Sequence, residues 1–137
     1  MAVTINRTIA DGAQTATFEV VSTGTTGLAE SGTVLDVSSL SGGGGDGRER
    51  VRVVWIQALV CGDGTNVKLE WETSGTNIAF LTIPEGSIDM KIRCNPAGQN
   101  LTGDITFTSS ADTPFTLHVK VEKIQSFGGS MARTSSL

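Results

Sequence analysis

The chain of 137 residues is poor in the side chains from which most catalytic sites are built. It has no tyrosine, two cysteines, two tryptophans and one histidine, His118. A catalytic triad or a zinc site needs several such groups converging on one point, and no C-x-x-C or H-x-x-x-H spacing is present. We therefore expect no enzyme activity, no metal and no cofactor, and we place His118 at the surface or in an interface.

Long apolar runs and concentrated positive charge are also missing. The longest apolar stretch, Val53–Cys61, falls far short of the roughly 20 residues that span a bilayer. The net charge is -4, whereas nucleic-acid-binding modules carry a basic face. Residues Met1–Arg7 lack the segments of a signal peptide. We expect no membrane or nucleic-acid partner, and synthesis and retention in a cytoplasm unless a leader has been removed.

The two cysteines lie far apart in the sequence. Cys61 ends an apolar stretch, and Cys94 precedes an Asn95-Pro96 turn. A disulfide between them is possible, but two reduced thiols are what a reducing compartment favours.

What the chain does have is strand periodicity. Val67–Glu72 and Phe115–Glu122 alternate apolar and polar residues with a period of two, which is typical of strands buried on one face. Such an alternation places His118 opposite Leu117 and Val119. The segments predicted as strands are Val3–Ile9, Thr15–Val21, Thr33–Leu40, Arg48–Cys61, Val67–Thr73, Ile78–Ile83, Ser87–Cys94, Leu101–Thr108 and Pro114–Ile124.

Turn signals separate these segments, and no convincing helix is present. Gly62-Asp63-Gly64 between two strand patterns predicts a hairpin. This organisation predicts an all-β fold, a single antiparallel β-sandwich of eight or nine strands that is jelly-roll-like. The sandwich covers residues 1–124, with 41–47 as a Gly-rich surface loop. Residues 125–137 lack periodicity and are predicted as an extended or flexible tail, and the N-terminal segment is also extended.

Two sets of side chains, aspartates and tryptophans, and the arginines described next each have both a structural and a functional interpretation. Asp46, Asp63 and Asp104 adjoin glycines, and turn chemistry explains them better than calcium binding. Trp55 and Trp71 could stack on sugars, but their apolar surroundings favour core packing.

Three arginines, Arg48, Arg50 and Arg52, alternate along one side of a strand. They either meet an acidic partner or form a solvated face that discourages edge pairing.

Several segments, taken in order, carry a family resemblance. They are Trp55–Val60, Gly64, Val67–Trp71, Asn95–Gly98, Thr102–Thr108, Phe115–Leu117 and Lys120. This succession resembles the small β-sandwich virion proteins of tailed bacteriophages, namely capsid decoration (cement) proteins and related head or tail accessory proteins. The resemblance covers about half of the chain and excludes both 41–47 and the tail.

The resemblance implies a structural virion protein that is made in the host cytoplasm and binds the outside of the capsid. Its partner would be the lattice of the major capsid protein, which it would stabilise as a homo-oligomer, with a trimer favoured. The two ends of the chain, Met1–Arg7 and Gln125–Leu137, would carry contacts to the capsid or to neighbouring protomers. With the arginine strand included, the candidate partner-binding residues are Val3, Ile5, Arg7, Arg48, Arg50, Arg52, Phe127, Met131 and Arg133.

Other functions stay open at this point. A phage tail, head-completion or fibre component would reuse the same sandwich. A carbohydrate-binding module would need exposed aromatic side chains, and a hydrolase would need partners for His118.

Overall fold

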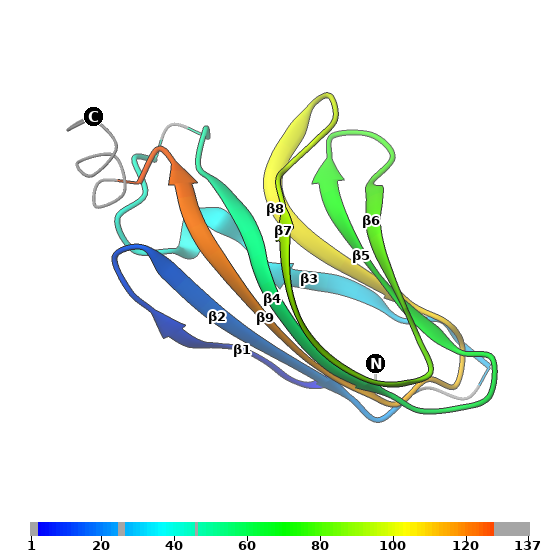
Figure 1. The fold of residues 1–137 in the computed structure, drawn as a ribbon. Coiled ribbons are helices and arrows are strands. Elements are labelled where there is room, and N and C mark those ends of the chain that lie inside the picture. The colour runs from blue at the N-terminus through cyan, green and yellow to red at the C-terminus, as the bar shows by residue number, and fades with distance from the viewer. Residues whose placement is uncertain (1–2, 25–26, 46, 128–137) are drawn as a thin grey trace.

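The computed structural model is all-β, as predicted, and consists of two antiparallel sheets (Figure 1). It describes residues 3–24, 27–45 and 47–127, without the side chain of Thr4. Within these ranges no α-helix occurs, and the predicted strand 33–40 is instead a shorter strand followed by a single 3-10 turn, η1 (Val37–Ser39). The strands are β1 (Val3–Asp11), β2 (Thr15–Ser22), β3 (Ser31–Leu35), β4 (Arg50–Val60), β5 (Asn66–Thr73), β6 (Ile78–Pro84), β7 (Gly86–Cys94), β8 (Leu101–Ser109) and β9 (Phe115–Gln125).

The two sheets enclose one hydrophobic core. One sheet has the order β1-β2-β9-β4-β7 and the other β3-β8-β5-β6. The period-two patterns explain the packing, because β2 and β9 alternate strictly between buried and partly exposed residues along most of their length. Core side chains come from both sheets, for example Phe18, Ile56, Val119, Leu69 and Ile105.

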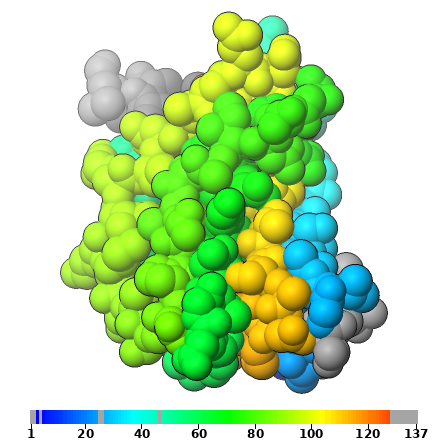
Figure 2. Space-filling view, turned by 90° about the vertical axis from the view of Figure 1, so that its right-hand side faces the viewer, coloured from blue at the N-terminus to red at the C-terminus, as the bar shows by residue number. Residues whose placement is uncertain are grey.

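Links between the sheets close the two sides of this core. On one side β6 and β7 belong to different sheets and are joined through Glu85 and Gly86, whose φ of 115° favours glycine. Figure 2 views this side, where the green to yellow-green atoms of β5, β6 and β7 form a continuous surface. On the other side the Asn6 amide of β1 donates to the Thr33 carbonyl of β3 at 2.7 Å. Each sheet therefore stays aligned with its partner at both sides.

A β-bulge in β4 reverses which residues of that strand face the core. The pairing with β9 advances from Val53 to Trp55 on β4 while it advances by one residue on β9, and the register with β7 is broken at the same place. Because a bulge inserts one residue, the side-chain alternation changes phase across it. The buried residues are accordingly Val51 and Val53 before the bulge and Ile56, Ala58 and Val60 after it.

The two tryptophans differ as a result. Trp71 is buried, as predicted, and its ring stacks on Phe80 with the centroids 4.6 Å apart. The prediction of a core position for Trp55 is wrong, because the bulge turns it to the outer side of the sheet, where it is half-buried.

A buried lysine joins three distant segments near the end of β9. Lys123 is fully buried, and its ammonium group donates to Asp11 Oδ1 and to the Gly12 carbonyl, both at 2.6 Å. It also donates to the carbonyl and hydroxyl oxygens of Ser41, at 2.8 and 3.2 Å. The Phe127 ring centroid lies 5.3 Å from the ammonium nitrogen. The β1–β2 turn, the start of the Gly-rich segment and the end of β9 are thus held together.

The packed part of the chain extends beyond the sequence-based boundary at residue 124. Strand β9 continues to Gln125, and Phe127 is fully buried and forms a β-bridge with Gly43. Phe127 is therefore a core residue, and its side chain is not available for the partner contact predicted from the sequence. Residues 41–45 and 47 are exposed, as expected for a surface loop. The predictions for Met131 and Arg133 lie outside the described residues.

We expect Lys123→Met to lower the free energy of unfolding by about 3 kcal/mol, because it leaves Asp11 and two carbonyl groups without their buried cation. Urea denaturation at neutral pH measures the change. Lys120→Met is the matched control, since Lys120 lies on the same strand with an exposed side chain, and it should shift stability by less than about 0.5 kcal/mol. Equal midpoints for the two variants would show that the buried ammonium group is not a structural anchor.

Candidate functional site

The outer side of the five-stranded sheet carries rows of functional side chains that run across the strands. One row joins β1, β2, β9, β4 and β7 in register, since each of its members pairs with the next. We call it the polar row, and it consists of Arg7, Glu19, His118, Gln57 and Asp89.

A chain of hydrogen bonds through Glu19 occupies one half of the polar row. The His118 Nε2 atom lies 2.8 Å from Glu19 Oε2, and the Arg7 Nε–H donates to Glu19 Oε1 at 2.8 Å. The hydrogen bonds with His118 and then Arg7 hold the pKa of Glu19 below its usual value. His118 is partly exposed, in accordance with its predicted surface position. The carboxylate partner that sequence analysis could not identify for it is Glu19.

A second row, the aromatic-basic row, lies beside the polar row. It consists of Thr17, Lys120, Trp55 and Lys91, which also pair successively across β2, β9, β4 and β7. The Trp55 indole N–H donates to Asp89 Oδ1 at 2.8 Å and so links the two rows. Trp55 is thereby flanked on both sides by lysines at fixed register positions.

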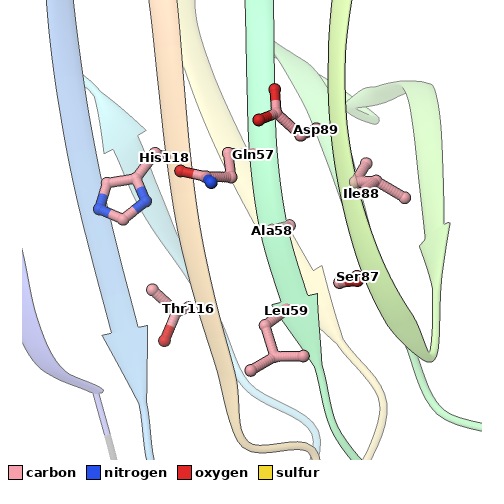
Figure 3. Close-up of a pocket in the computed structure, with 8 residues that line it drawn as sticks. All are labelled: Gln57, Ala58, Leu59, Ser87, Ile88, Asp89, Thr116 and His118. Atoms are coloured by element: carbon pink, nitrogen blue, oxygen red, sulfur yellow. The ribbon is translucent and has the colours of Figure 1, made fainter.

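Two shallow hollows lie over these rows. The first, of about 460 Å³, is lined by side chains that include Gln57, Leu59, Asp89 and His118. Figure 3 shows His118 and Gln57 side by side on neighbouring strands, with Asp89 near Gln57 and Leu59 further along β4. The second hollow, of about 490 Å³, is lined by Val54, Trp55, Lys91 and Lys120. Both volumes are in the range of small-molecule sites.

A third row is mainly apolar and runs along the other side of the polar row. Its members are Ile5, Val21, Thr116, Leu59 and Ser87. Ile5 and Leu59 have exposed fractions of 37% and 50%, so this row presents apolar surface to solvent. Contact with a partner would bury it favourably.

The arrangement is suited to binding more than to nucleophilic catalysis. The His118–Glu19 pair resembles the base and orienting acid of a triad, but within the described residues neither Thr116 nor Ser87 donates a hydroxyl hydrogen bond to His118. In the part of the chain that the structure covers, no three His, Cys, Asp or Glu side chains form a group that could hold a metal ion. Nor does any helix in that part have the length and apolarity to cross a membrane.

The candidate partner-binding residues are not brought together into one surface. Val3, Ile5 and Arg7 share β1, where Val3 packs against the core and Ile5 is exposed. Arg7 is exposed but ion-paired with Glu19.

The arginine strand is tied into the chain itself. Arg50 donates to the Leu101 and Glu49 carbonyls at 2.9 and 2.7 Å, and Arg52 pairs with Glu122 at 3.3 Å. The Arg52 side chain is 16% exposed and β4 is paired on both sides, so the interpretation of a solvated face that discourages edge pairing is wrong. Arg48 is exposed.

Of the three aspartates assigned to turns, Asp46 lies outside the described residues and Asp63 lies in the turn before β5. For Asp104 the prediction is wrong, because it belongs to β8 and accepts a hydrogen bond from the Val37 N–H at 3.0 Å. Burial raises the pKa of Asp104 to about 6; the Val37 hydrogen bond opposes this, and the negative charge of Asp36 adds to it.

The raised pKa of Asp104 predicts a pH dependence of stability. The folded state binds this proton more tightly than the unfolded state does, so the stabilisation is complete below a pH of about 3.8 and is lost as pH rises through about 6. Asp104→Asn should remove this loss while it keeps an acceptor for Val37. Urea titrations from about pH 4 to about pH 7 measure the difference. Asp63→Asn, an exposed turn variant, is the control, and a wild-type slope in Asp104→Asn would contradict the assignment.

Both cysteines are free thiols. Cys61 is exposed and Cys94 is half-buried. Burial raises the pKa of the Cys94 thiol, while a hydrogen bond with the Trp71 side chain acts in the opposite direction.

Sequence reasoning missed the aromatic-basic row and most of the polar row. The apolar stretch Val53–Cys61 carries Leu59 and Trp55 on the outer side of the sheet, where Leu59 is exposed and Trp55 half-buried. Gln57 within that stretch was the one available signal of an outward face. Comparisons with protein families, with curated proteins and with solved structures found no significant match to this chain.

Proposed function

We propose that the chain is a non-enzymatic structural protein of a phage virion, which binds the outside of the assembled capsid and stabilises it. The sequence resemblance motivates this function, and the observation that carries it is the edge strand β1. Ile5 and Ile9 of β1 are 37% and 49% exposed. Within the described residues β1 pairs on one side with β2, and its other edge has no strand partner. Such an edge is suited to attachment to a neighbouring subunit.

The strand order supports a jelly-roll form of the β-sandwich. Strands β2 to β9 divide into β2-β9-β4-β7 and β3-β8-β5-β6, and β1 is an additional strand at one edge. Each sheet thus combines early and late strands, as two wrapped Greek keys do. Jelly rolls recur in viral capsid and lectin domains, but fold alone does not establish function. The proposed assembly is a homo-oligomer, with a trimer favoured, on the lattice of the major capsid protein.

A tail, head-completion or fibre component is the nearest alternative, since the same exposed edge would serve it equally. Binding of the purified chain to expanded capsids that lack it separates the two. Saturable co-sedimentation at a copy number set by the lattice, with a rise in shell melting temperature, supports decoration. Binding to tails alone would overturn the capsid assignment.

For the edge strand, we expect the double variant Ile5→Asp/Ile9→Asp to weaken capsid binding by at least about tenfold, because two apolar contacts become charged. Co-sedimentation isotherms give the affinities. Leu28→Asp is the matched control, because Leu28 is 62% exposed but lies outside the β-strands. Equal binding by both variants would exclude β1 as the attachment edge.

The C-terminal segment gives a separate prediction. Deletion of residues 128–137 should weaken particle binding and leave the urea midpoint unchanged. Deletion from residue 125 should also destabilise the fold by about 3 kcal/mol, since it removes the buried Phe127. Unchanged particle binding after the shorter deletion would exclude residues 128–137 from the contact.

A further inference from the structure

We propose that the hollow over Trp55, Lys91 and Lys120 binds an acidic saccharide, that is, a sugar carrying a carboxylate or a sulfate group. This binding activity is distinct from capsid attachment and uses a different part of the chain, strands β9, β4 and β7 of the five-stranded sheet. The aromatic-basic row lines the hollow and the polar row lies beside it.

On this face the acidic side chains have partners within the chain, whereas two of the basic side chains have none among the described residues. Glu19 is paired with Arg7 and His118, Glu122 is paired with Arg52, and Asp89 accepts the Trp55 N–H. The side-chain ammonium groups of Lys91 and Lys120, in contrast, form neither a hydrogen bond nor an ion pair with the residues that the structure describes. Two ammonium groups therefore remain available to an anion on both sides of one indole ring, although the chain as a whole has a net charge of -4.

An aromatic ring flanked by two cations favours a ligand that has both a flat apolar surface and a negative charge. An indole ring offers a flat apolar surface for the C–H groups of a pyranose, and two lysines supply ionic hydrogen bonds to a carboxylate or sulfate. The neighbouring hollow adds the Gln57 amide, His118 and the Asp89 carboxylate, which together donate to and accept from sugar hydroxyls. An acidic saccharide of two or more units would engage both hollows.

An acidic peptide fits this site less well. Trp55 and Lys120 lie on β4 and β9, which are paired on both sides, so strand addition cannot reach them; of the three strands only β7, which carries Lys91, has an unpaired edge within the described residues. An oligonucleotide would stack on Trp55, but its phosphates need a continuous basic track. Here carboxylates of Asp89 and Glu19 interrupt the positive charge. Contacts over Trp55 and Lys120 therefore use side chains alone, over a small area, which suits a saccharide.

Isothermal titration calorimetry of the full chain tests the proposal with defined probes. The acidic probes are tetragalacturonic acid, which carries carboxylates, and a heparin-derived tetrasaccharide, which also carries sulfates. The comparison probes are neutral cellotetraose, a tetraglutamate peptide and a four-residue oligothymidylate. We expect saturable binding of one or both acidic saccharides, weakened by added salt, and no measurable binding of the comparison probes. Which acidic probe binds identifies the anionic group.

Variants locate the binding. Lys91→Met/Lys120→Met should lower the affinity for the acidic saccharide by at least about tenfold. Trp55→Leu should abolish binding of the saccharide. Lys68→Met is the control, because Lys68 is an exposed lysine on β5 of the other sheet, and it should bind as the wild type does. The lysine double variant keeps the test decisive if Trp55→Leu fails to fold.

Three results would overturn the proposal: neither acidic saccharide binds, a comparison probe binds as tightly, or Lys68→Met loses as much affinity as the double variant. Capsid co-sedimentation of Lys91→Met/Lys120→Met should match the wild type. The saccharide site and the capsid attachment can therefore fail independently.

Discussion

The buried ammonium group of Lys123 is the interaction on which the arrangement of this fold depends most. Four oxygen atoms from the β1–β2 turn and Ser41 surround a cation that has no access to water. Burial acts to raise the pKa of Asp11, but the hydrogen bonds with Lys123 and Ser41 outweigh it and hold that pKa below its usual value. An unpaired charge at this depth would be strongly unfavourable, so the three segments must stay together whenever the core is formed.

The packing around Lys123 determines which side chains the five-stranded sheet exposes on its outer side. Phe127 packs beside the lysine and pairs with Gly43, while the Gly44 N–H donates to the Ser126 carbonyl at 2.8 Å. The end of β9 is thus held, and with it the register of β9 against β2 and β4. Because register places Glu19 opposite His118 and Trp55 opposite Lys120, the outer rows follow from the same packing. A shift by one residue would turn each row to the other face.

The sequence predicted those features of the fold and the outer surface that residues close together in the chain determine, and it did not predict those that depend on pairing with distant strands. Alternation in Phe115–Glu122 correctly predicted which side of β9 is buried and that His118 faces outward. The all-β class and most strand ranges followed in the same way. Trp55 could not be placed, because the bulge arises from pairing with β9, which the sequence of β4 alone does not specify. Phe127 was likewise predicted as part of a tail, since Gly43, with which it forms a β-bridge, lies in a distant segment of the chain.

The bulge in β4 has an evolutionary consequence. A strand of the same sequence without the bulge would continue the alternation of Val51 and Val53, so that Trp55 would point into the core and Ile56 outward. The one extra residue at the bulge therefore couples core packing and surface chemistry in this strand. Substitutions at outward positions such as Gln57 leave the core untouched, so the surface can diversify by point mutation, whereas a one-residue insertion or deletion away from the bulge would move core side chains to the outer face.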